Sequence, residues 1–227
     1  MRFMRVLYTY HISFKYNQRD FGEKGRMLRF ITIALVTLLL GCINMPVQAT
    51  SVLPVDLTQL HRDSQRIIYA ECIDNKVEID TTMNNMVVTY TTFSVLQTLK
   101  GPKEQTVTIK QIGGSMPDGS AALKIAGVPK FKLNEKYVVF LAKPSKLGFS
   151  SPIGLSQGSF RAFKDNQGNM TVTNGRDFGE LMANMHKDKM PAAAQSIISE
   201  ATKKKSSATH PNNTLRLNDF MLVIENM

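Results

Sequence analysis

Alternating apolar and polar residues indicate β-structure through the middle of the chain. Residues 105–112 alternate cleanly, with Val107 and Ile109 on one side and threonine and lysine on the other. This is the pattern of a strand with one buried face. Residues 137–141, Tyr-Val-Val-Phe-Leu, are instead continuously apolar, which indicates a strand that is buried on both faces. We therefore expect this second strand to be central and covered by other segments.

Four further stretches are rich in β-branched and aromatic residues, which favours strands. They cover residues 66–80, 86–99, 153–163 and 169–173, with a turn over 82–85 between the first two. Gly154 and Gly158 fall inside the third stretch, where they suggest a bend or bulge of the kind that barrel corners require.

Helical patterns flank this β-rich region. A short helix is predicted over 55–63 with Asp56 as its N-cap, and two more over 177–186 and 192–203, the latter led by Pro191. A last helix is predicted within 215–227, with Asn218 as its cap. One helical turn over 121–126 is expected inside the long loop 113–130.

The N-terminal region carries an export signal. Residues 30–42 are an uncharged run behind Arg26 and Arg29, too short to span a bilayer comfortably but suited to a signal peptide. The favoured interpretation is cleavage after Ala49. The second is a lipobox-like sequence with lipidation of Cys42, and the third is an uncleaved membrane anchor. Met27 begins a conventional leader by itself, so we expect residues 1–26 to be a wrongly assigned or disordered extension.

These elements divide the chain into consecutive segments. We expect a signal peptide over 27–49, a β-barrel domain over 50–173, a helical extension over 174–203, a linker over 204–213 and a C-terminal helix over 214–227. The expected fold is mainly β, a small antiparallel OB-like Greek-key barrel with short flanking helices.

The order of the strand signals resembles the netrin-module and tissue-inhibitor-of-metalloproteinase type of OB domain. The matching pieces are residues 67–73, 92–101 with Leu-Lys-Gly at the end, 107–114 and 135–141. The same layout is similar to a class of small exported bacterial proteins. The resemblance covers roughly residues 66–163 and implies an OB fold.

One departure limits what this resemblance implies about function. The inhibitors chelate the protease zinc through a mature N-terminal cysteine inside a disulfide-rich domain. Here cleavage after Ala49 leaves Thr50 first, and Cys72 would then have no partner for a disulfide within the chain. Inhibition by that mechanism is therefore not implied, and Cys72 is expected to be a buried, inert thiol.

The net charge of +10 is concentrated at the N-terminus. Residues 1–49 carry seven Lys and Arg against two Asp and Glu, which leaves 21 against 16, or +5, in the remainder. Nucleic-acid binding needs a denser basic stripe than this. No nucleic-acid partner is expected, and a membrane contact only if Cys42 is lipidated.

Two patterns carry possible chemistry. Met182, Met185, His186 and Met190 are the candidate metal ligands, because thioether and imidazole suit Cu(I). The commoner role of such methionines is to fill a core. Ser156 stands in a Gly-x-Ser-x-Gly match, but this hydrolase motif works at a strand-to-helix elbow, and no α/β pattern surrounds it.

The favoured function is an exported, non-enzymatic binding protein of the bacterial cell envelope, with no cofactor. Its partner would be a protein or another envelope component. Long loops on a β-scaffold commonly bind, so the binding residues are expected in the loop 113–130, namely Gly113, Gly114, Met116, Asp118 and Ile125. A serine hydrolase using Ser156 and a periplasmic copper protein remain the alternatives.

Overall fold

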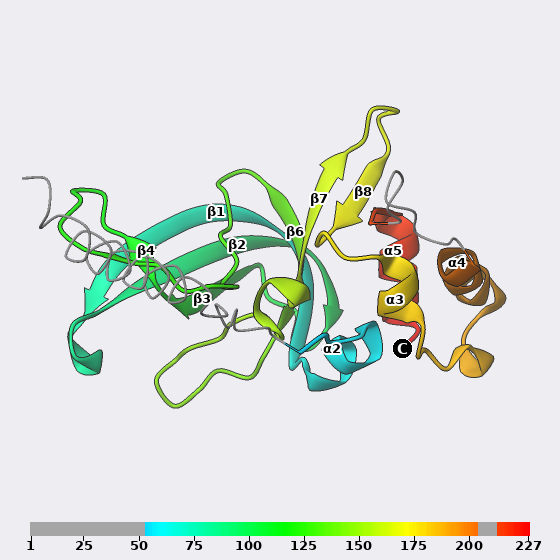
Figure 1. The fold of residues 1–227 in the computed structure, drawn as a ribbon, viewed down its shortest axis with the longest axis horizontal. Coiled ribbons are helices and arrows are strands. Elements are labelled where there is room, and N and C mark those ends of the chain that lie inside the picture. Colours follow the sequence, from blue (N-terminus) through cyan, green and yellow to red (C-terminus); the bar gives the residue numbers. More distant parts are fainter. Residues whose placement is uncertain (1–52, 204–212) are drawn as a thin grey trace, which may run out of the picture. The chain divides into compact units, whose positions relative to one another are not determined.

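The computed structural model describes residues 53–203 and 213–227, which belong to one compact unit, Ser51–Met227. The predicted signal peptide, Cys42, the cleavage site at Ala49 and most of the predicted linker lie outside the described residues. The fold is mainly β with flanking helices, which confirms the predicted class (Figure 1).

Seven strands form one antiparallel sheet in the order β3-β2-β1-β6-β7-β8-β9, and β4 and β5 form a separate pair. The strands are β1 (Arg66–Asp80), β2 (Met86–Lys100), β3 (Thr106–Ile112), β4 (Gly114–Ser115), β5 (Ala122–Leu123), β6 (Lys136–Leu141), β7 (Ser159–Lys164), β8 (Met170–Thr173) and β9 (Leu215–Arg216). The α-helices are α2 (Leu57–Asp63), α3 (Phe178–Met182), α4 (Ala192–Lys203) and α5 (Leu217–Glu225), and short 3-10 helices are η1 (Thr81–Met83), η2 (Leu155–Gly158) and η3 (Lys187–Lys189).

The central strand β6 is buried on both faces, as its continuous apolar sequence predicts. Val138 and Phe140 point into one hydrophobic cluster, and Tyr137, Val139 and Leu141 point into another. Successive side chains of a strand face opposite sides of the sheet. The sheet therefore separates two cores.

The first core joins the sheet to the helices. Figure 1 shows α3, α4 and α5 gathered beside β7 and β8. The ring of Phe160 in β7 lies 4.6 Å from that of Phe220 in α5 and 6.0 Å from that of Phe178 in α3, measured between centroids. The helices thus supply the apolar surface that covers this face of the sheet.

The second core lies on the other face, among β1, β2, β3 and β6. Ala70 and Cys72 from β1 meet Phe93 from β2 and Ile109 from β3, and all four are fully or almost fully buried. Register shifts along the β1–β2 ladder, including one between Cys72 and Asp74, mark bulges that bend the pair. The bent strands curve around this core.

The strand ladders do not close into the predicted barrel. Within the described residues, β3 pairs only with β2 and β9 only with β8, so both are edges. Two isolated bridges nevertheless join the 149–152 segment to both β3 and β6. Lys110 of β3 pairs with Phe149 in parallel, and Leu141 of β6 pairs with Pro152. The nitrogen of Ser150 donates to the carbonyl of Lys110 at 3.2 Å.

The predicted strand 153–163 is shorter in the structure. Gly154 and Leu155 both have φ near 60°, a left-handed conformation that an extended strand does not adopt. The chain therefore turns through η2, and β7 begins only at Ser159. The predicted bend at the glycines is present, but it precedes the strand.

Two predicted helix ends also differ. α3 ends at Met182, because the Ala183 nitrogen donates back to Glu180 in a tighter 3-10 turn, so the helix does not run to residue 186. Asn218 does not cap α5. β9 pairs with β8 through Arg216, and the helix begins directly after it at Leu217, which places Asn218 inside the first turn.

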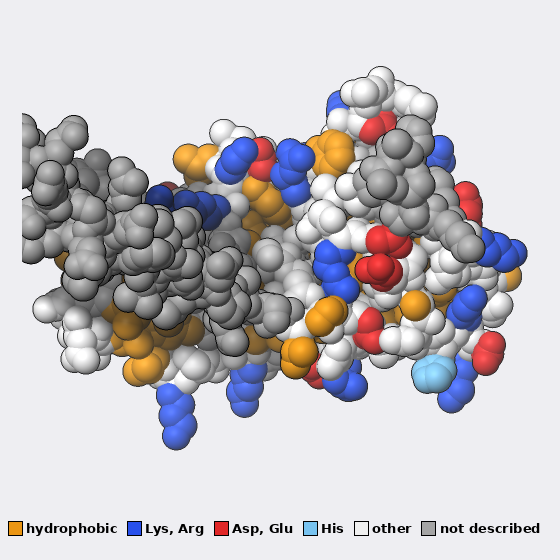
Figure 2. Space-filling view, viewed as in Figure 1, with side chains coloured by type: hydrophobic (Ala, Val, Ile, Leu, Met, Phe, Trp, Pro, Cys, Tyr) orange, Lys and Arg blue, Asp and Glu red, His pale blue; other side chains and the backbone are white. Residues whose placement is uncertain are grey.

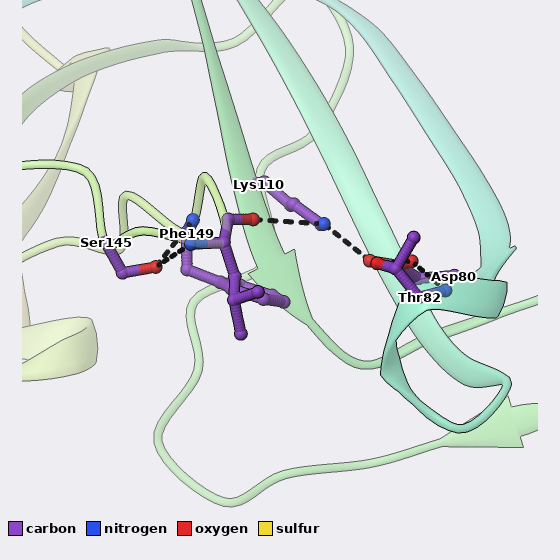
Figure 3. Close-up of polar contacts among 6 residues, drawn as sticks. Asp80, Thr82, Lys110, Ser145 and Phe149 are labelled. Atoms are coloured by element: carbon purple, nitrogen blue, oxygen red, sulfur yellow. Dashed lines mark hydrogen bonds and ion pairs between the residues drawn. The ribbon is translucent and has the colours of Figure 1, made fainter.

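An ion pair between Asp80 and Lys110 joins the turn end of the β1–β2 hairpin to β3 (Figure 3). The Nζ of Lys110 lies 2.5 Å from Oδ2 of Asp80, whose other oxygen accepts from the nitrogen and hydroxyl of Thr82. The Lys110 ammonium also donates to the carbonyl of Leu147 and lies 4.6 Å from the ring centroid of Phe149. One lysine thus joins the hairpin end to β3 and to the 145–149 segment.

We predict that this ion pair makes stability sensitive to acid. The hydrogen bonds from Lys110 and Thr82 lower the pKa of Asp80 from 3.8 to about 2. A carboxyl whose pKa is lower in the folded state stabilises the fold above its unfolded pKa and loses that effect as pH falls through the folded value. The urea midpoint of the wild type should therefore fall as pH drops from 3.8 toward about 2, and Asp80→Asn should flatten this part of the profile.

The surface ion pair between Lys76 and Glu78 gives the matched control. Its Nζ–Oε2 distance is 2.7 Å, but the lysine side chain is 68% exposed, and exposed pairs contribute little. Glu78→Gln should leave the acid profile as in the wild type. An Asp80→Asn profile that parallels the wild type would contradict the role given to this pair.

Candidate functional site

The loop after β3 folds as a small hairpin and not as the predicted helical turn over 121–126. Gly114 pairs with Leu123, and Ser115 with Ala122. At the tip, Oδ1 of Asp118 accepts from both the nitrogen and the hydroxyl of Ser120. The alanine-rich stretch has helical propensity, but propensity is weak, and the Pro-Asp-Gly turn ahead of it returns the chain as a strand.

Two glycines let this loop leave β3 and pass close to β2. Gly113 and Gly114 have φ of 99° and 143°. A Cβ at Gly114 would lie 2.5 Å from the hydroxyl oxygen of Thr89. That hydroxyl donates to the carbonyl of Gly113 at 2.6 Å. The glycines therefore fix the loop over the ends of β1, β2 and β3.

A cavity of about 680 Å³ lies between these strands and the loop. Small-molecule sites usually enclose about 300–1,000 Å³, so its size suits a ligand. Its lining comes from three strands and from both arms of the loop, and is mostly apolar. The residues that line it include Asn75, Val77, Thr91, Gln111, Ile112, Leu123, Lys124, Ile125, Ala126, Val128, Lys130 and Phe131.

The floor of the cavity carries a row of polar side chains above the second core. The hydroxyl of Thr91 donates to Oδ1 of Asn75 at 2.7 Å, and Nδ2 of Asn75 donates to the carbonyl of Phe131 at 2.9 Å. These bonds tie β1 and β2 to the end of the loop. The hydroxyl of Thr91 and the amide of Asn75 therefore already have partners.

Gln111 differs from its neighbours on this floor. It is 3% exposed, and its Nε2 has no hydrogen-bond partner among the described residues. Most buried side-chain polar atoms have at least one partner. Gln111 is among the lining residues of the cavity, and its side chain holds a buried donor without a partner.

The rim of the cavity is basic and partly apolar. Lys124 and Lys130 line it and are exposed, and no acidic residue is among its lining residues in the described chain. Ile125, also in the lining, is 40% exposed. The mouth therefore combines positive charge with exposed aliphatic surface.

We predict that replacing Gln111 stabilises the free protein. A buried donor without a partner costs about 1–3 kcal/mol, and an apolar group of similar shape removes that cost. Gln111→Met should therefore raise the free energy of unfolding in urea by about 1–2 kcal/mol. Gln105→Met, at an exposed position just before β3, should change it little. A clear loss of stability in Gln111→Met would show that the amide has a partner in the folded protein.

The expected loop residues divide between the cavity and the hairpin tip. Gly113, Gly114 and Ile125 line the cavity, whereas Met116 and Asp118 do not. Sequence reasoning missed the strand residues of the site, Asn75, Thr91 and Gln111. A signal for Gln111 was present, since it continues the inward series of Val107 and Ile109 on β3 with a polar residue.

The structure places the three candidate methionine ligands in or against one core and His186 at the surface. Met182 and Met185 are buried in the first core, and Met190 packs against it. His186 is exposed, and it lies beyond the end of α3 rather than on one helical face with the methionines. Met182 and Met185 therefore fill a core. No group of three or more His, Cys, Asp or Glu suited to a metal ion occurs in the described residues.

Ser156 lies in η2, between a left-handed turn and β7, and not at a strand-to-helix elbow. Its side chain is exposed, and its backbone nitrogen donates to the carbonyl of Gly127. No hydrogen bond of its hydroxyl is present within residues 53–203 and 213–227. The geometry of a nucleophile elbow is therefore not formed here.

Cys72 is fully buried and its thiol is free, as expected. Burial, as the largest cause, raises its pKa, and a raised pKa disfavours the reactive thiolate. Nδ2 of Asn75 lies 3.4 Å from its sulfur. Cys72 therefore belongs to the packing beneath the cavity floor.

Other surfaces of the described chain are weaker candidates for a binding site. A hollow of about 760 Å³ runs along α4, but residues of that single helix line it, so it does not enclose a ligand. On the face shown in Figure 2, Lys and Arg side chains are scattered and do not form a stripe. In the part of the chain that the structure describes, no helix has the length and hydropathy needed to cross a membrane.

Neither a known protein family, by its model, nor a curated protein matches this chain.

Proposed function

We propose that this chain is an exported binding protein of the cell envelope, and that the cavity under the loop 113–131 is its binding site. The observation that carries the proposal is the buried, unpartnered amide of Gln111 at the wall of a mostly apolar cavity of about 680 Å³. Apolar walls with a few placed polar groups are typical of ligand sites. The signal-like apolar run at residues 30–42 supports export.

We further propose that the domain is OB-like. The bridges of Lys110 with Phe149 and of Leu141 with Pro152 support this, because together they link β3 through the 149–152 segment to β6. The loop 113–131 would then cover one end of the barrel. Ligands commonly bind in the mouths of β-barrels.

The test compares two tryptophan substitutions in the same loop, with the anionic apolar dye 1-anilinonaphthalene-8-sulfonate as probe. Ala126 is exposed and lines the cavity, whereas Ala122 is exposed on β5 and does not. The dye should fluoresce with the folded wild type and with Ala122→Trp, and much less with Ala126→Trp, whose indole would fill the mouth. No dye binding to the wild type, or equal binding to both variants, would contradict the proposal.

Export is tested separately by the intact mass of the mature protein. Cleavage after Ala49 gives a chain that begins at Thr50, whereas lipidation gives a diacylated chain that begins at Cys42. The first mass is the expected one. An unprocessed mass in an exporting cell would contradict export by cleavage.

A further inference from the structure

We propose that the ligand of the cavity is an aliphatic carboxylate, a free fatty acid, whose head group accepts a hydrogen bond from Nε2 of Gln111. This inference rests on the proposed function and adds the chemical class of the ligand. It follows from three properties of the described cavity: the aliphatic walls, the buried amide nitrogen of Gln111 that has no partner, and the sign of the charge.

The walls favour an aliphatic chain over an aromatic ring. They are formed by Val77, Ile112, Leu123 and Val128 among others, and Phe131 is the one aromatic residue in the lining. The Phe131 ring is already used, because its centroid lies 4.9 Å from that of Phe93 and 5.0 Å from that of Tyr137, both edge to face. Aromatic ligands prefer such ring contacts, and no second ring is available in the lining.

The hydrogen bonds on the cavity floor favour a ligand that carries a hydrogen-bond acceptor. The Thr91 hydroxyl donates to Asn75, and the Asn75 amide donates to the carbonyl of Phe131. The donor left without a partner is the amide of Gln111. A ligand carbonyl or carboxylate oxygen would satisfy it, whereas an ammonium group has no acceptor to offer.

The charge of the lining selects an anion. Lys124 and Lys130 are its two charged residues. Their field favours a carboxylate over a neutral ester and opposes a cation. A hydrogen bond to a charged group is also stronger than one between neutral groups. The deep amide and the basic rim therefore both favour a carboxylate on an aliphatic chain.

Calorimetric titration with four ligands of equal chain length tests this class. The ligands are dodecanoate, methyl dodecanoate, dodecanol and dodecyltrimethylammonium, each below the concentration at which it forms micelles. Dodecanoate should bind the wild type most tightly, and the ammonium at least about tenfold more weakly. The methyl ester keeps the acceptor without the charge and should fall between them. Equal affinity for dodecanoate and the ammonium would overturn the proposal.

Two variants locate the site. Gln111→Met should weaken dodecanoate binding about tenfold or more while the protein remains folded, because a charge-assisted hydrogen bond is worth about 1.5–3 kcal/mol. Ala126→Trp should weaken it as well, and Ala122→Trp should not. Unchanged affinity in both Gln111→Met and Ala126→Trp would overturn the proposal even if dodecanoate binds.

The outcomes separate this inference from the proposed function. If the sulfonated dye binds and Ala126→Trp blocks it, but dodecanoate does not bind, the cavity is a binding site and the ligand class is wrong. If neither probe binds the folded wild type, both proposals fail. Dodecanoate binding that also requires Gln111 supports both.

Discussion

Phe220→Ala is expected to lower the free energy of unfolding by about 3–5 kcal/mol, the usual cost of removing a fully buried phenylalanine. The Phe220 ring is completely buried and lies within 6.3 Å of three other rings, those of Phe140, Phe160 and Phe178. These rings come from β6, β7 and α3. The truncation leaves a cavity where the C-terminal helix meets the sheet. The three neighbouring rings in the first core then lose their contact with Phe220.

The control is Asn218→Ala on the same helix. Asn218 is exposed, and the structure places it inside the first turn rather than at the cap. Its removal should change the free energy of unfolding by less than about 0.5 kcal/mol. Urea denaturation followed by circular dichroism measures both variants. Similar losses in the two would contradict the packing of α5 described above.

Gly158→Ala is expected to lower the free energy of unfolding by about 3 kcal/mol, which is at the upper end of the cost of overpacking a well-packed site. A Cβ at Gly158 would lie 2.4 Å from the carbonyl oxygen of Ile153 and 3.1 Å from its nitrogen. Both are backbone atoms, so no side-chain rotation relieves the contact. The Ile153 nitrogen donates to Phe140 on β6 at 2.8 Å, and displacing it would disturb the segment that approaches the β3 edge.

Gly168→Ala separates this steric effect from backbone strain. Gly168 has φ of 83°, but nothing lies within 4 Å of a Cβ placed there. Its substitution by alanine should lower the free energy of unfolding by about 1–2 kcal/mol, the penalty for placing a residue with a Cβ in the left-handed conformation. Thermal and urea unfolding measure both variants. A smaller loss for Gly158→Ala than for Gly168→Ala would contradict the close approach of Ile153.

Much of the fold could be predicted from local patterns. The alternation in β3, the continuous apolar run of β6 and the Asp56 cap, which accepts from Gln59 at 2.7 Å, are all present as expected. These features depend on residues close together in the sequence. Burial on two faces also follows locally, because a strand of only apolar residues has no side to offer to water.

The errors at the starts of β7 and α5 arise because distant residues decide the local structure. The start of β7 is set by the turn at Gly154 and by Gln157, whose Oε1 accepts from the nitrogen of Val55 at 3.0 Å. The start of α5 is set by the pairing of Arg216 with Thr171 on β8. Neither partner is indicated by the sequence nearby. Closure of a barrel likewise depends on which strand edges meet, and the pattern of each strand does not determine this.

The sequence predicts the loop as a binding surface, whereas the proposed site is the cavity beneath it. The glycines at 113 and 114 could be identified from sequence because they interrupt a strand pattern. The sequence pattern also indicates that Gln111 faces inward with Val107 and Ile109. It does not indicate that the Gln111 amide lacks a partner, since an inward glutamine is ordinary when it has one. Only the three-dimensional arrangement shows that Thr91 donates to Asn75 and Asn75 to Phe131, and that Nε2 of Gln111 has no partner among the described residues.

The central claim is that the amide of Gln111 receives a ligand inside the cavity. The most direct measurement is a nuclear magnetic resonance titration of the protein with dodecanoate, with the side-chain amide signals of Gln111 assigned through their loss in Gln111→Met. We expect both of these signals to move in a saturable way, together with the methyl signals of Val77 and Val128 across the cavity. Saturable binding that leaves the Gln111 signals in place, or no binding at all, would contradict the account.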